Sequence, residues 1–295
     1  MPEKLDVAIL GSGNIGTDLL IKVLRSPYLN CTRFIGRNLS SPGMRKASSL
    51  GVHISDRSID AIIDDPTCCE LVFDATTAIY HQKNAPILKD LGIKTIDMTP
   101  SQVGKMCVPA INLSDCIASP NVNMITCGGQ TAIPVAHAIS QVQSRIVYIE
   151  IVSSISSRSA GPGTRANIDE YIENTESGLR QMTGCQNVKA ILNLNPAVPS
   201  IDSQSSVFVL VDSPDMDAIS RSVAAMVEQM VTYVPGYELI VPPLFENGRI
   251  AAMVKVRGLG DFLPQFAGNL DIINCAAITL AEAYAREKHN SSPLI

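Results

Sequence analysis

A strand, a glycine-rich turn and a helix follow one another at the N-terminus, and this order constrains the fold most. The apolar run Leu5–Leu10 predicts a short buried strand, and Gly11-Ser-Gly13-Asn-Ile-Gly16 follows it directly. The next nine residues place Leu20, Val23 and Leu24 on one helical face. A G-x-G-x-x-G run between a strand and a helix is the fingerprint of a dinucleotide-binding Rossmann unit.

The three glycines have separate roles in that fingerprint. Gly11 permits the tight turn, Gly13 lets the backbone approach a pyrophosphate, and Gly16 allows close packing of helix on strand. The N-terminus of the helix then receives the phosphate charge. The alternative is a glycine-rich turn in a doubly wound fold that has lost its cofactor.

The segment after the second predicted strand leaves the choice of cofactor open. At this place an acid usually holds the adenosine ribose, but here the strand Cys31–Gly36 leads into Arg37-Asn-Leu-Ser-Ser41. Arg37 with hydroxyl neighbours could accommodate a 2′-phosphate, which would favour NADP or dual use. Equally, Arg37 could stack on the adenine or lie in solvent.

The run from Asn121 to Gln130 points to a reactive cysteine. An apolar segment ends at Cys127, two glycines follow, and residues 131–139 have a helical pattern in which Pro134 fits the first turn. We therefore expect Cys127 near the positive end of a helix dipole, which lowers a thiol pKa and stabilises an oxyanion. The alternative is a buried cysteine that closes a β–α turn.

Composition narrows the class of protein. A length of 295 residues predicts two domains, and 46% hydrophobic with 17% charged residues describes a well-packed globular chain. A net charge of −5 without a basic cluster argues against nucleic acid as a partner. The eight cysteines form no C-x-x-C pair, so we expect a reducing compartment and no metal site. With neither a signal peptide nor a membrane span in the sequence, we expect a cytoplasmic protein with no membrane partner.

The second half of the chain changes character. A long β-branched strand over residues 145–153 leads to a Ser/Gly-rich loop that carries Arg158 and Arg165. This loop could grip a phosphate or a carboxylate, or it could be an ordinary surface loop. Strands and helices then cease to alternate strictly, which predicts an α+β domain with a largely antiparallel sheet. We expect a Rossmann domain over 1–126, completed by a C-terminal helix at 270–288, and a second domain over 127–269.

Two histidines could serve as bases, and for both a structural role is the better interpretation. His81 lies on a predicted helix face near the surface, although a ligand or base role stays open. His137 lies nearly three helical turns beyond Cys127, too far for a Cys–His pair.

Four separated motifs resemble the CoA-acylating (acetylating) acetaldehyde dehydrogenases. They are Gly11-Ser-Gly-Asn-Ile-Gly16, Asn123-Met-Ile-Thr-Cys-Gly-Gly-Gln130, Ser159-Ala-Gly-Pro-Gly-Thr-Arg-Ala-Asn-Ile-Asp-Glu170 and Ala267-Gly-Asn-Leu-Asp-Ile272. The resemblance covers residues 5 to about 287. It implies a fold like that of glyceraldehyde-3-phosphate dehydrogenase, with an α/β Rossmann domain and an α+β catalytic and dimerisation domain.

The resemblance also implies an activity. Members oxidise acetaldehyde, or a short aldehyde such as propanal, with NAD and with CoA as co-substrate to the acyl-CoA, in the meta-cleavage degradation of aromatics. They form homodimers and pair with a 4-hydroxy-2-oxovalerate aldolase. By the resemblance, Cys127 is the catalytic nucleophile that forms the acyl thioester. The implied cofactor-binding residues are Ser12, Gly13, Asn14, Ile15, Arg158, Ser159, Ala160, Gly161, Pro162, Gly163, Thr164, Arg165, Ala166 and Asn269.

The chain departs from the family pattern in two places. Where members carry a Met-Arg-Asp-Thr segment with an acid near the thiol, this chain has Ser203-Gln-Ser205-Ser206, so Ser205 takes the acid's place. Asp202 could substitute, but an offset of three along a strand points it to the opposite face. The segment between Pro242 and Val254 is also shorter than in the family.

Two other functions fit part of the pattern. One is a semialdehyde or acyl-phosphate reductase of the same architecture, which should have a catalytic histidine in the second domain. The other is a non-catalytic Rossmann partner of an aldolase, which the missing acid at position 205 would favour.

Overall fold

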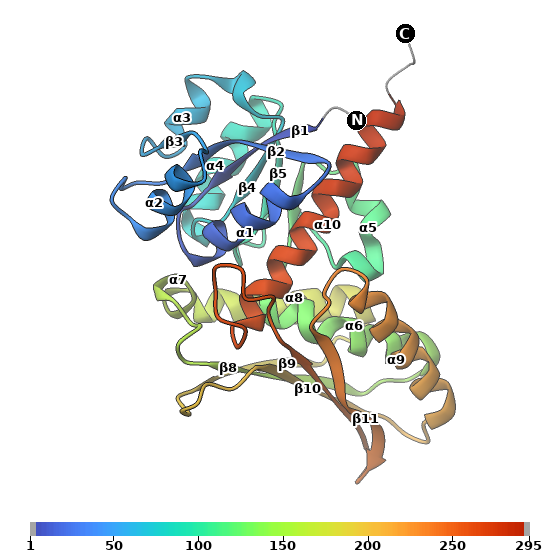
Figure 1. Ribbon diagram of the computed structural model, residues 1–295. Coiled ribbons are helices and arrows are strands. Elements are labelled where there is room, and N and C mark those ends of the chain that lie inside the picture. Colours follow the sequence, from blue (N-terminus) through green and yellow to red (C-terminus); the bar gives the residue numbers. More distant parts are fainter. Residues whose placement is uncertain (1–3, 292–295) are drawn as a thin grey trace. The chain divides into compact units, whose positions relative to one another are not determined.

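The computed structural model describes residues 4–291 of the chain, which form two units (Figure 1). The first unit contains the residues up to 124 and those from 274 onward, and the second contains residues 125–273. Among residues 4–291, no helix combines the length and the apolar character needed to cross a bilayer.

A seven-stranded parallel sheet forms the centre of the first unit, in the order β3-β2-β1-β4-β5-β7-β6. All residues of β4 and β5 are buried, as expected for central parallel strands covered on both faces. The strand order reverses between β1 and β4, the point at which sheets of this kind bind ligands. The strands are β1 (Leu5–Leu10), β2 (Leu29–Ile35), β3 (Ile54–Ser55), β4 (Leu71–Asp74), β5 (Lys94–Asp97), β6 (Lys105–Met106) and β7 (Asn121–Asn123).

Helices connect these strands, and a C-terminal helix completes the unit. The connecting helices are α1 (Asn14–Arg25), α2 (Pro42–Ser49), α3 (Asp60–Ile63), α4 (Ala78–Asp90) and α5 (Pro109–Ile117), with a short 3₁₀ turn at Pro66–Cys68. Helix α10 (Gly268–Ser291) crosses the division between the units. Within the first unit, Asn274 of α10 donates to the Ile15 carbonyl and to the Asp18 carboxylate, at 3.2 and 3.0 Å.

A mixed five-stranded sheet forms the second unit, in the order β11-β12-β10-β8-β9. Its pairings are antiparallel except for the parallel pair of β8 and β9. The strands are β8 (Tyr148–Ser156), β9 (Val188–Asn195), β10 (Ser203–Leu210), β11 (Tyr237–Glu246) and β12 (Arg249–Val256). The helices are α6 (Cys127–Val142), α7 (Pro162–Ala166), α8 (Ile168–Thr183) and α9 (Met216–Val231).

The second sheet has one covered and one open face. Helices α6, α8 and α9 pack on one side of it (Figure 1). Along β10 the residues toward the helices, such as Val207 and Val209, are buried, while Phe208 and Leu210 on the other face are partly exposed. Both units thus confirm the predicted fold class, an α/β Rossmann domain with an α+β domain.

Two glycines of the turn after β1 have no room for a side chain. Gly11 has a left-handed φ of +120°, and a Cβ there would lie 2.5 Å from the Ala75 carbonyl oxygen. A Cβ on Gly16 would lie 1.9 Å from the carbonyl oxygen of Gly11. A Cβ on Gly13, in contrast, would meet nothing within 4 Å. Gly11 and Gly16 are therefore required by the fold, whereas the space beside Gly13 is open.

We expect Gly16→Ala and Gly13→Ala to differ in stability. Gly16→Ala forces the backbone of the turn to shift and should lower the free energy of unfolding by about 1–3 kcal/mol. Gly13→Ala keeps an allowed conformation and should cost at most about 1 kcal/mol, the range of N-cap changes. Urea denaturation followed by circular dichroism measures both, and equal losses would contradict the assignment.

Candidate functional site

The turn that precedes Cys127 has an unusual backbone. Strand β7 ends at Asn123, and Ile125 follows in the left-handed region with a φ of 61°. This conformation is rare for a β-branched residue and costs on the order of 1–3 kcal/mol. Thr126 then caps α6, since its hydroxyl accepts a hydrogen bond from Gly129 N at 2.9 Å. Cys127 is therefore the first residue of the helix, at the positive end of its dipole.

The predicted start of this helix was wrong by four residues. The helical pattern was expected from Thr131, with Pro134 in the first turn, but α6 begins at Cys127 and Pro134 lies inside it. The Thr126 cap and the burial of the whole first turn outweigh the low helix propensity of Gly128 and Gly129.

Helix α8 holds the turn in place. The Asn174 amide donates to the Ile125 carbonyl oxygen at 2.8 Å, and the hydroxyls of Thr126 and Thr175 lie 2.7 Å apart. Gly178 leaves room for the Ile125 side chain, because a Cβ there would lie 3.0 Å from two of its carbons. These contacts offset the strain of the turn.

A row of hydroxyl groups begins at the thiol. The Cys127 thiol lies 3.7 Å from the Tyr171 hydroxyl oxygen, which also accepts a hydrogen bond from Gly128 N at 2.9 Å. The hydroxyls of Ser153 and Ser205 lie 3.0 Å apart. A Cβ on Gly128 would lie 2.1 Å from the Tyr171 oxygen and 2.6 Å from the Ser153 oxygen. The glycine after the cysteine therefore makes space for both hydroxyls.

The thiol pKa differs from the sequence-based expectation. Burial raises the pKa of Cys127 above its ordinary value, although the Tyr171 hydroxyl, the N–H groups of Gly128 and Cys127 and the Asn269 amide act in the opposite direction. The expected lowering of the pKa is thus wrong for the chain alone. A sequence shows the helix terminus but not the desolvation that outweighs it.

Asn269, the second residue of α10, has a buried amide whose one neighbour of note among residues 4–291 is the Cys127 thiol. The residue is 1% exposed and lies beside the Cys127 sulfur. Neither its Nδ2 nor its Oδ1 has a hydrogen-bond partner among residues 4–291. A buried amide with neither bond made costs free energy unless a ligand completes it.

The Ser/Gly-rich loop uses one of its two cations internally. Arg165 donates to the carbonyl oxygens of Ala160 and Ser157 and to the Ser157 hydroxyl, at 2.9–3.0 Å. The Arg158 side chain is exposed, while Ser159 and Ala160 are buried. The rest of the predicted loop, Gly161, Pro162, Gly163, Thr164 and Ala166, enters and forms the short helix α7.

The fingerprint residues face outward in the first unit. Gly13 and Asn14 are exposed, and Ser12 and Ile15 are half-buried. Helix α1 begins at Asn14 and has no side-chain cap, so its first N–H groups are available to an anion. Arg37 follows β2, and its guanidinium carbon lies 5.4 Å from the centre of the Tyr80 ring. This stacking fixes Arg37 beside the side chain of a neighbouring helix.

Comparison with known proteins identifies the family. The chain is 57% identical to an acetaldehyde dehydrogenase of Pectobacterium atrosepticum over 282 residues, which cover 95% of each chain. It is 54% identical to an acetaldehyde dehydrogenase of Spirochaeta aurantia, over 97% of each. The chain belongs to the acetaldehyde dehydrogenase family. Residues 127–264 match the family model of the prokaryotic acetaldehyde dehydrogenase dimerisation domain.

Solved structures of another enzyme group share the fold. An aspartate semialdehyde dehydrogenase II of Vibrio cholerae, solved with ASA, has a TM-score of 0.67 at 14% identity and covers 97% of this chain and 99% of its own. The Candida albicans enzyme, solved with NADP, has a TM-score of 0.68 at 10% identity and covers 96% of this chain and 100% of its own. At these identities the likeness concerns the fold alone, and it agrees with the predicted fold class.

Within this family member, the sequence interpretation missed the contribution of α8. Tyr171, Asn174 and Thr175 have the i, i+3, i+4 spacing of one helix face, and all three are buried. Polar residues on a buried face were the available signal. The Nδ1 atom of His137 lies 2.6 Å from the Met182 carbonyl oxygen, so this histidine is packed as expected.

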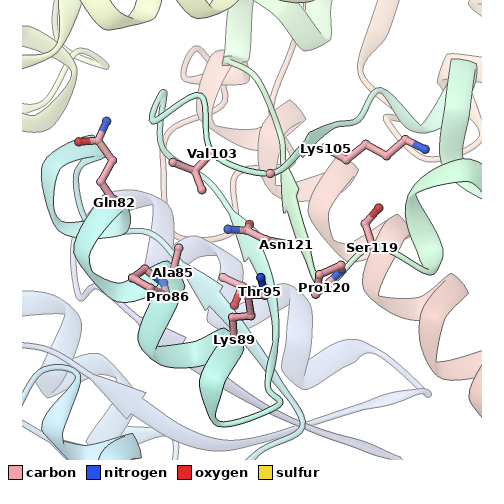
Figure 2. Close-up of a pocket in the computed structure, with 11 residues that line it drawn as sticks. Gln82, Ala85, Pro86, Lys89, Thr95, Val103, Lys105, Ser119, Pro120 and Asn121 are labelled. Carbon is pink, nitrogen blue, oxygen red and sulfur yellow. The ribbon is translucent and has the colours of Figure 1, made fainter.

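A cavity of about 470 Å³ lies in the first unit, and none of the predicted site residues lines it (Figure 2). Its wall is formed by one face of α4, by residues 103–105 and by residues 119–121. None of the fingerprint residues lines it. The cavity therefore has no part in the chemistry considered below.

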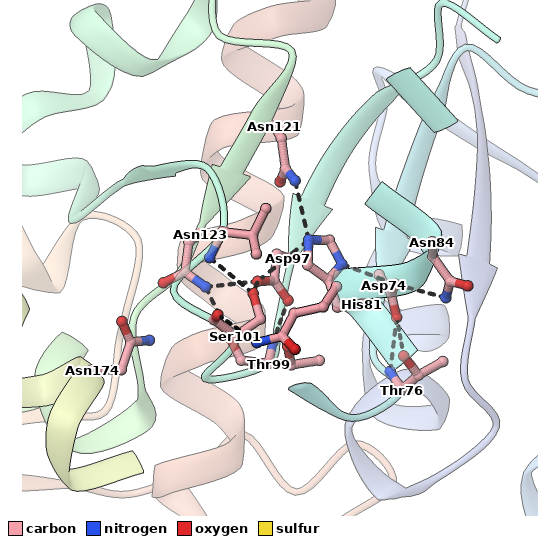
Figure 3. A network of polar contacts seen from close by, with 12 residues as sticks. Asp74, Thr76, His81, Asn84, Asp97, Thr99, Ser101, Asn121, Asn123 and Asn174 are labelled. Atoms are coloured by element: carbon pink, nitrogen blue, oxygen red, sulfur yellow. Dashed lines mark hydrogen bonds and ion pairs between the residues drawn. The ribbon is translucent and has the colours of Figure 1, made fainter. Parts of the chain in front are cut away.

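His81 occupies a different environment from the predicted one. It is fully buried rather than on a surface helix face, and its Nδ1 lies 2.9 Å from Asp74 and its Nε2 3.5 Å from Asp97 (Figure 3). The two aspartates end the neighbouring strands β4 and β5. Asn84 also donates to Asp74, and Asn123 donates to Asp97. This network fixes the carboxyl end of the first sheet.

The titration of this network follows from its burial and charges. Burial raises the pKa of Asp97 to about 6, against the lowering by the charge of His81. Burial alone would lower the pKa of His81, but Asp74 and Asp97 raise it above the ordinary value. The stability that His81 contributes is therefore present below pH ~6.5 and is lost as the pH rises through its folded-state pKa.

We expect His81→Leu to lower the free energy of unfolding by about 3–5 kcal/mol, because two buried carboxylates lose the cation between them. Adding Asp97→Asn to His81→Leu should restore part of that stability, since one uncompensated charge is removed. Urea denaturation between pH 6 and 8 measures both. The parent should lose stability over this range and the double variant, which lacks both His81 and the Asp97 carboxylate, much less; parallel pH curves for these two proteins would refute the buried charge.

Proposed function

We propose that this chain oxidises acetaldehyde, or a short aldehyde such as propanal, with NAD and CoA to the acyl-CoA and NADH. The observation that carries the proposal is the position of Cys127 at the first residue of a buried helix, with the unpartnered Asn269 amide beside its sulfur. Membership of the acetaldehyde dehydrogenase family supports the substrate. The proposal assigns the phosphate-binding turn to the first unit and the thiol chemistry to the second.

The residues of the turn are suited to a nicotinamide dinucleotide. Gly13 leaves space beside the backbone where a Cβ would stand, and the uncapped start of α1 offers N–H groups to a pyrophosphate. Ser12, Asn14 and Ile15 are the adjacent contacts. Asn269 offers a donor and an acceptor, which a nicotinamide carboxamide can both satisfy. The bound cofactor supplies a hydride acceptor.

Cys127 performs the covalent steps in this proposal. Its thiolate attacks the aldehyde carbon, and the carbonyl oxygen gains the negative charge. Because Cys127 is the first residue of α6, the N–H groups at the start of this helix are suited to stabilise that charge. After hydride loss, the sulfur holds an acyl thioester. The sulfur of CoA then attacks the acyl carbon, the CoA thiol proton passes to solvent, and the bond to Cys127 breaks and leaves Cys127 as a thiolate.

The loop from Arg158 to Ala166 is the proposed second grip on the nucleotide. Arg165 is bound to the carbonyl oxygens of its own loop, so it supports the loop shape rather than reaching outward. The exposed Arg158 is the cation available to a phosphate.

The competing functions have less support. A semialdehyde or acyl-phosphate reductase should have a histidine beside the thiol, and His137 instead interacts with the Met182 carbonyl oxygen. A non-catalytic partner of an aldolase would have no use for a buried amide without partners beside a cysteine.

We further propose a homodimer that associates with a 4-hydroxy-2-oxovalerate aldolase. The matched dimerisation domain and the partly exposed apolar side chains on the open face of the second sheet, such as Val152 and Phe208, support the dimer. The aldolase is inferred from the family resemblance, because it would supply the aldehyde.

Replacing Cys127 by alanine should abolish acyl-CoA formation, with a loss of more than about 10³-fold, and leave NADH binding nearly unchanged. The assay follows NADH at 340 nm with acetaldehyde, NAD and either CoA or phosphate. Cys185→Ala, another buried thiol of the second unit, is the control and should stay active. Turnover of Cys127→Ala within tenfold of the parent would sink the covalent mechanism, and a requirement for phosphate would favour the reductase.

Arg37 should make discrimination between NAD and NADP weak, because a cation rather than an acid follows β2. We expect kcat/KM for the two cofactors to differ by less than about a hundredfold, or 2.7 kcal/mol. Arg37→Ala should reduce activity with NADP more than with NAD. A preference for NAD above a hundredfold in the parent would show that another residue excludes the 2′-phosphate.

A further inference from the structure

Ser205 raises the question of how Cys127 is activated. By the family resemblance an acid belongs at this position, but here a serine with 1% exposure lies on the helix-covered face of β10. A serine hydroxyl does not accept a proton near neutral pH, so it cannot act as the base. Burial raises the thiol pKa at the same time, which increases the need for stabilisation of the thiolate.

The hydroxyl of Tyr171 is the group in contact with the sulfur. Its oxygen lies 3.7 Å from Cys127 Sγ and accepts a hydrogen bond from Gly128 N. The Ser153 hydroxyl is its next hydrogen-bond partner, and Ser205 lies 3.0 Å beyond Ser153. The serine at the family's acid position thus ends a row of hydroxyls that begins at the thiol.

We propose that Tyr171 is a catalytic residue that donates a hydrogen bond to the Cys127 thiolate, and that Ser153 and Ser205 are positioning residues that orient its hydroxyl. The proposal rests on the proposed function, in which Cys127 is the nucleophile. A hydrogen-bond donor to the thiolate thereby replaces a base for the thiol.

The proton balance of this activation is simple. In the thiol form, Cys127 S–H donates to the Tyr171 oxygen, and the Tyr171 O–H points to Ser153. When Cys127 loses its proton to water, the Tyr171 O–H turns to the sulfur and keeps its own proton. Ser153 then donates to the Tyr171 oxygen, and Ser205 donates to Ser153. Each of these bonds strengthens the next, because a donor that itself accepts a bond is polarised.

The groups around the thiol are consistent with a donor that stays protonated. Tyr171 comes from α8, the Asn269 amide from α10, and the N–H groups of Cys127 and Gly128 from α6. Of these only Tyr171 titrates, and burial and the neighbouring sulfur raise its pKa well above the ordinary value. Tyr171 therefore keeps its proton over the pH range in which the thiol ionises.

Asp202 does not take over the role of the acid. It precedes β10 rather than belonging to it, and the alternation of buried residues at 203, 205 and 207 leaves it out of the covered face.

The test measures the thiolate directly and needs no substrate. The rate of alkylation of Cys127 by iodoacetamide is followed by peptide mass spectrometry between pH 6 and 10. Tyr171→Phe should shift the profile to higher pH and reduce the rate at pH 7 about tenfold, the effect of one lost bond to a charged group. Tyr237→Phe is the matched control, because this buried tyrosine donates to the Thr131 carbonyl oxygen instead. It should leave the profile unchanged.

The role of Ser205 is tested by comparing two serine-to-alanine variants on strand β10. Ser205→Ala should slow alkylation at pH 7 about two- to threefold, since it removes the outer bond of the row. Ser203→Ala, a buried serine on the same face of β10, should have no effect. If circular dichroism shows that Tyr171→Phe does not fold, the comparison of Ser205→Ala with Ser203→Ala decides the proposal.

Identical profiles for Tyr171→Phe and Tyr237→Phe would overturn the role of Tyr171, and identical profiles for Ser205→Ala and Ser203→Ala would overturn that of the serines. The proposed function fails separately, if Cys127→Ala still forms acyl-CoA. The alkylation profiles are measured without aldehyde or CoA, so the two failures cannot be confused.

Discussion

The left-handed backbone of Ile125 is the constraint on which the second unit depends. It lies in the three-residue turn between Asn123 and Cys127, and Cys127 begins α6 at the positive end of the helix dipole. A β-branched residue does not adopt this conformation unless its surroundings enforce it. The inner face of α8 does so, with an amide on the Ile125 carbonyl, a hydroxyl on Thr126 and a glycine beneath the side chain. The same face carries Tyr171, so the helix that fixes the turn also determines what the sulfur touches.

The two units stabilise their buried polar groups in different ways. In the first, His81 lies between two aspartates, which also accept hydrogen bonds from asparagine side chains and from the backbone N–H groups of Thr76 and Thr99. In the second, neutral hydroxyls and an amide surround a thiol whose pKa burial raises. A raised pKa reduces the thiolate fraction, and the thiolate is the form that oxidants attack. Burial therefore both reduces the ionisation of Cys127 and disfavours its oxidation.

The sequence predicted features that depend on adjacent residues better than features that depend on contacts between distant segments. The strand, turn and helix around Gly11–Gly16 were readable from the sequence because each element follows from a few adjacent residues. The position of Cys127 at a strand-to-helix turn was also readable, but the start of its helix was not, since the Thr126 cap overrides two glycines. The pKa shift of Cys127 and the burial of His81 could not be predicted from the sequence, because desolvation depends on elements far along the chain. The contact of Tyr171 with Cys127 could not be predicted for the same reason, since the role of a polar residue on one helix depends on its partner on another helix.

The return of α10 to the first unit has a consequence for the order in which the chain folds. Asn274 completes the first unit through the Ile15 carbonyl and Asp18, and it lies 259 positions from Ile15 in the chain. During translation at about 5–20 residues per second, the glycine-rich turn leaves the ribosome on the order of tens of seconds before the helix that joins it. Until then the first unit lacks its C-terminal helix. The buried apolar residues of that helix include Ala276, Ala277, Leu280 and Ala281. The nascent chain therefore carries an unfinished first unit through most of its synthesis, and chaperones that bind apolar surface have that interval in which to act.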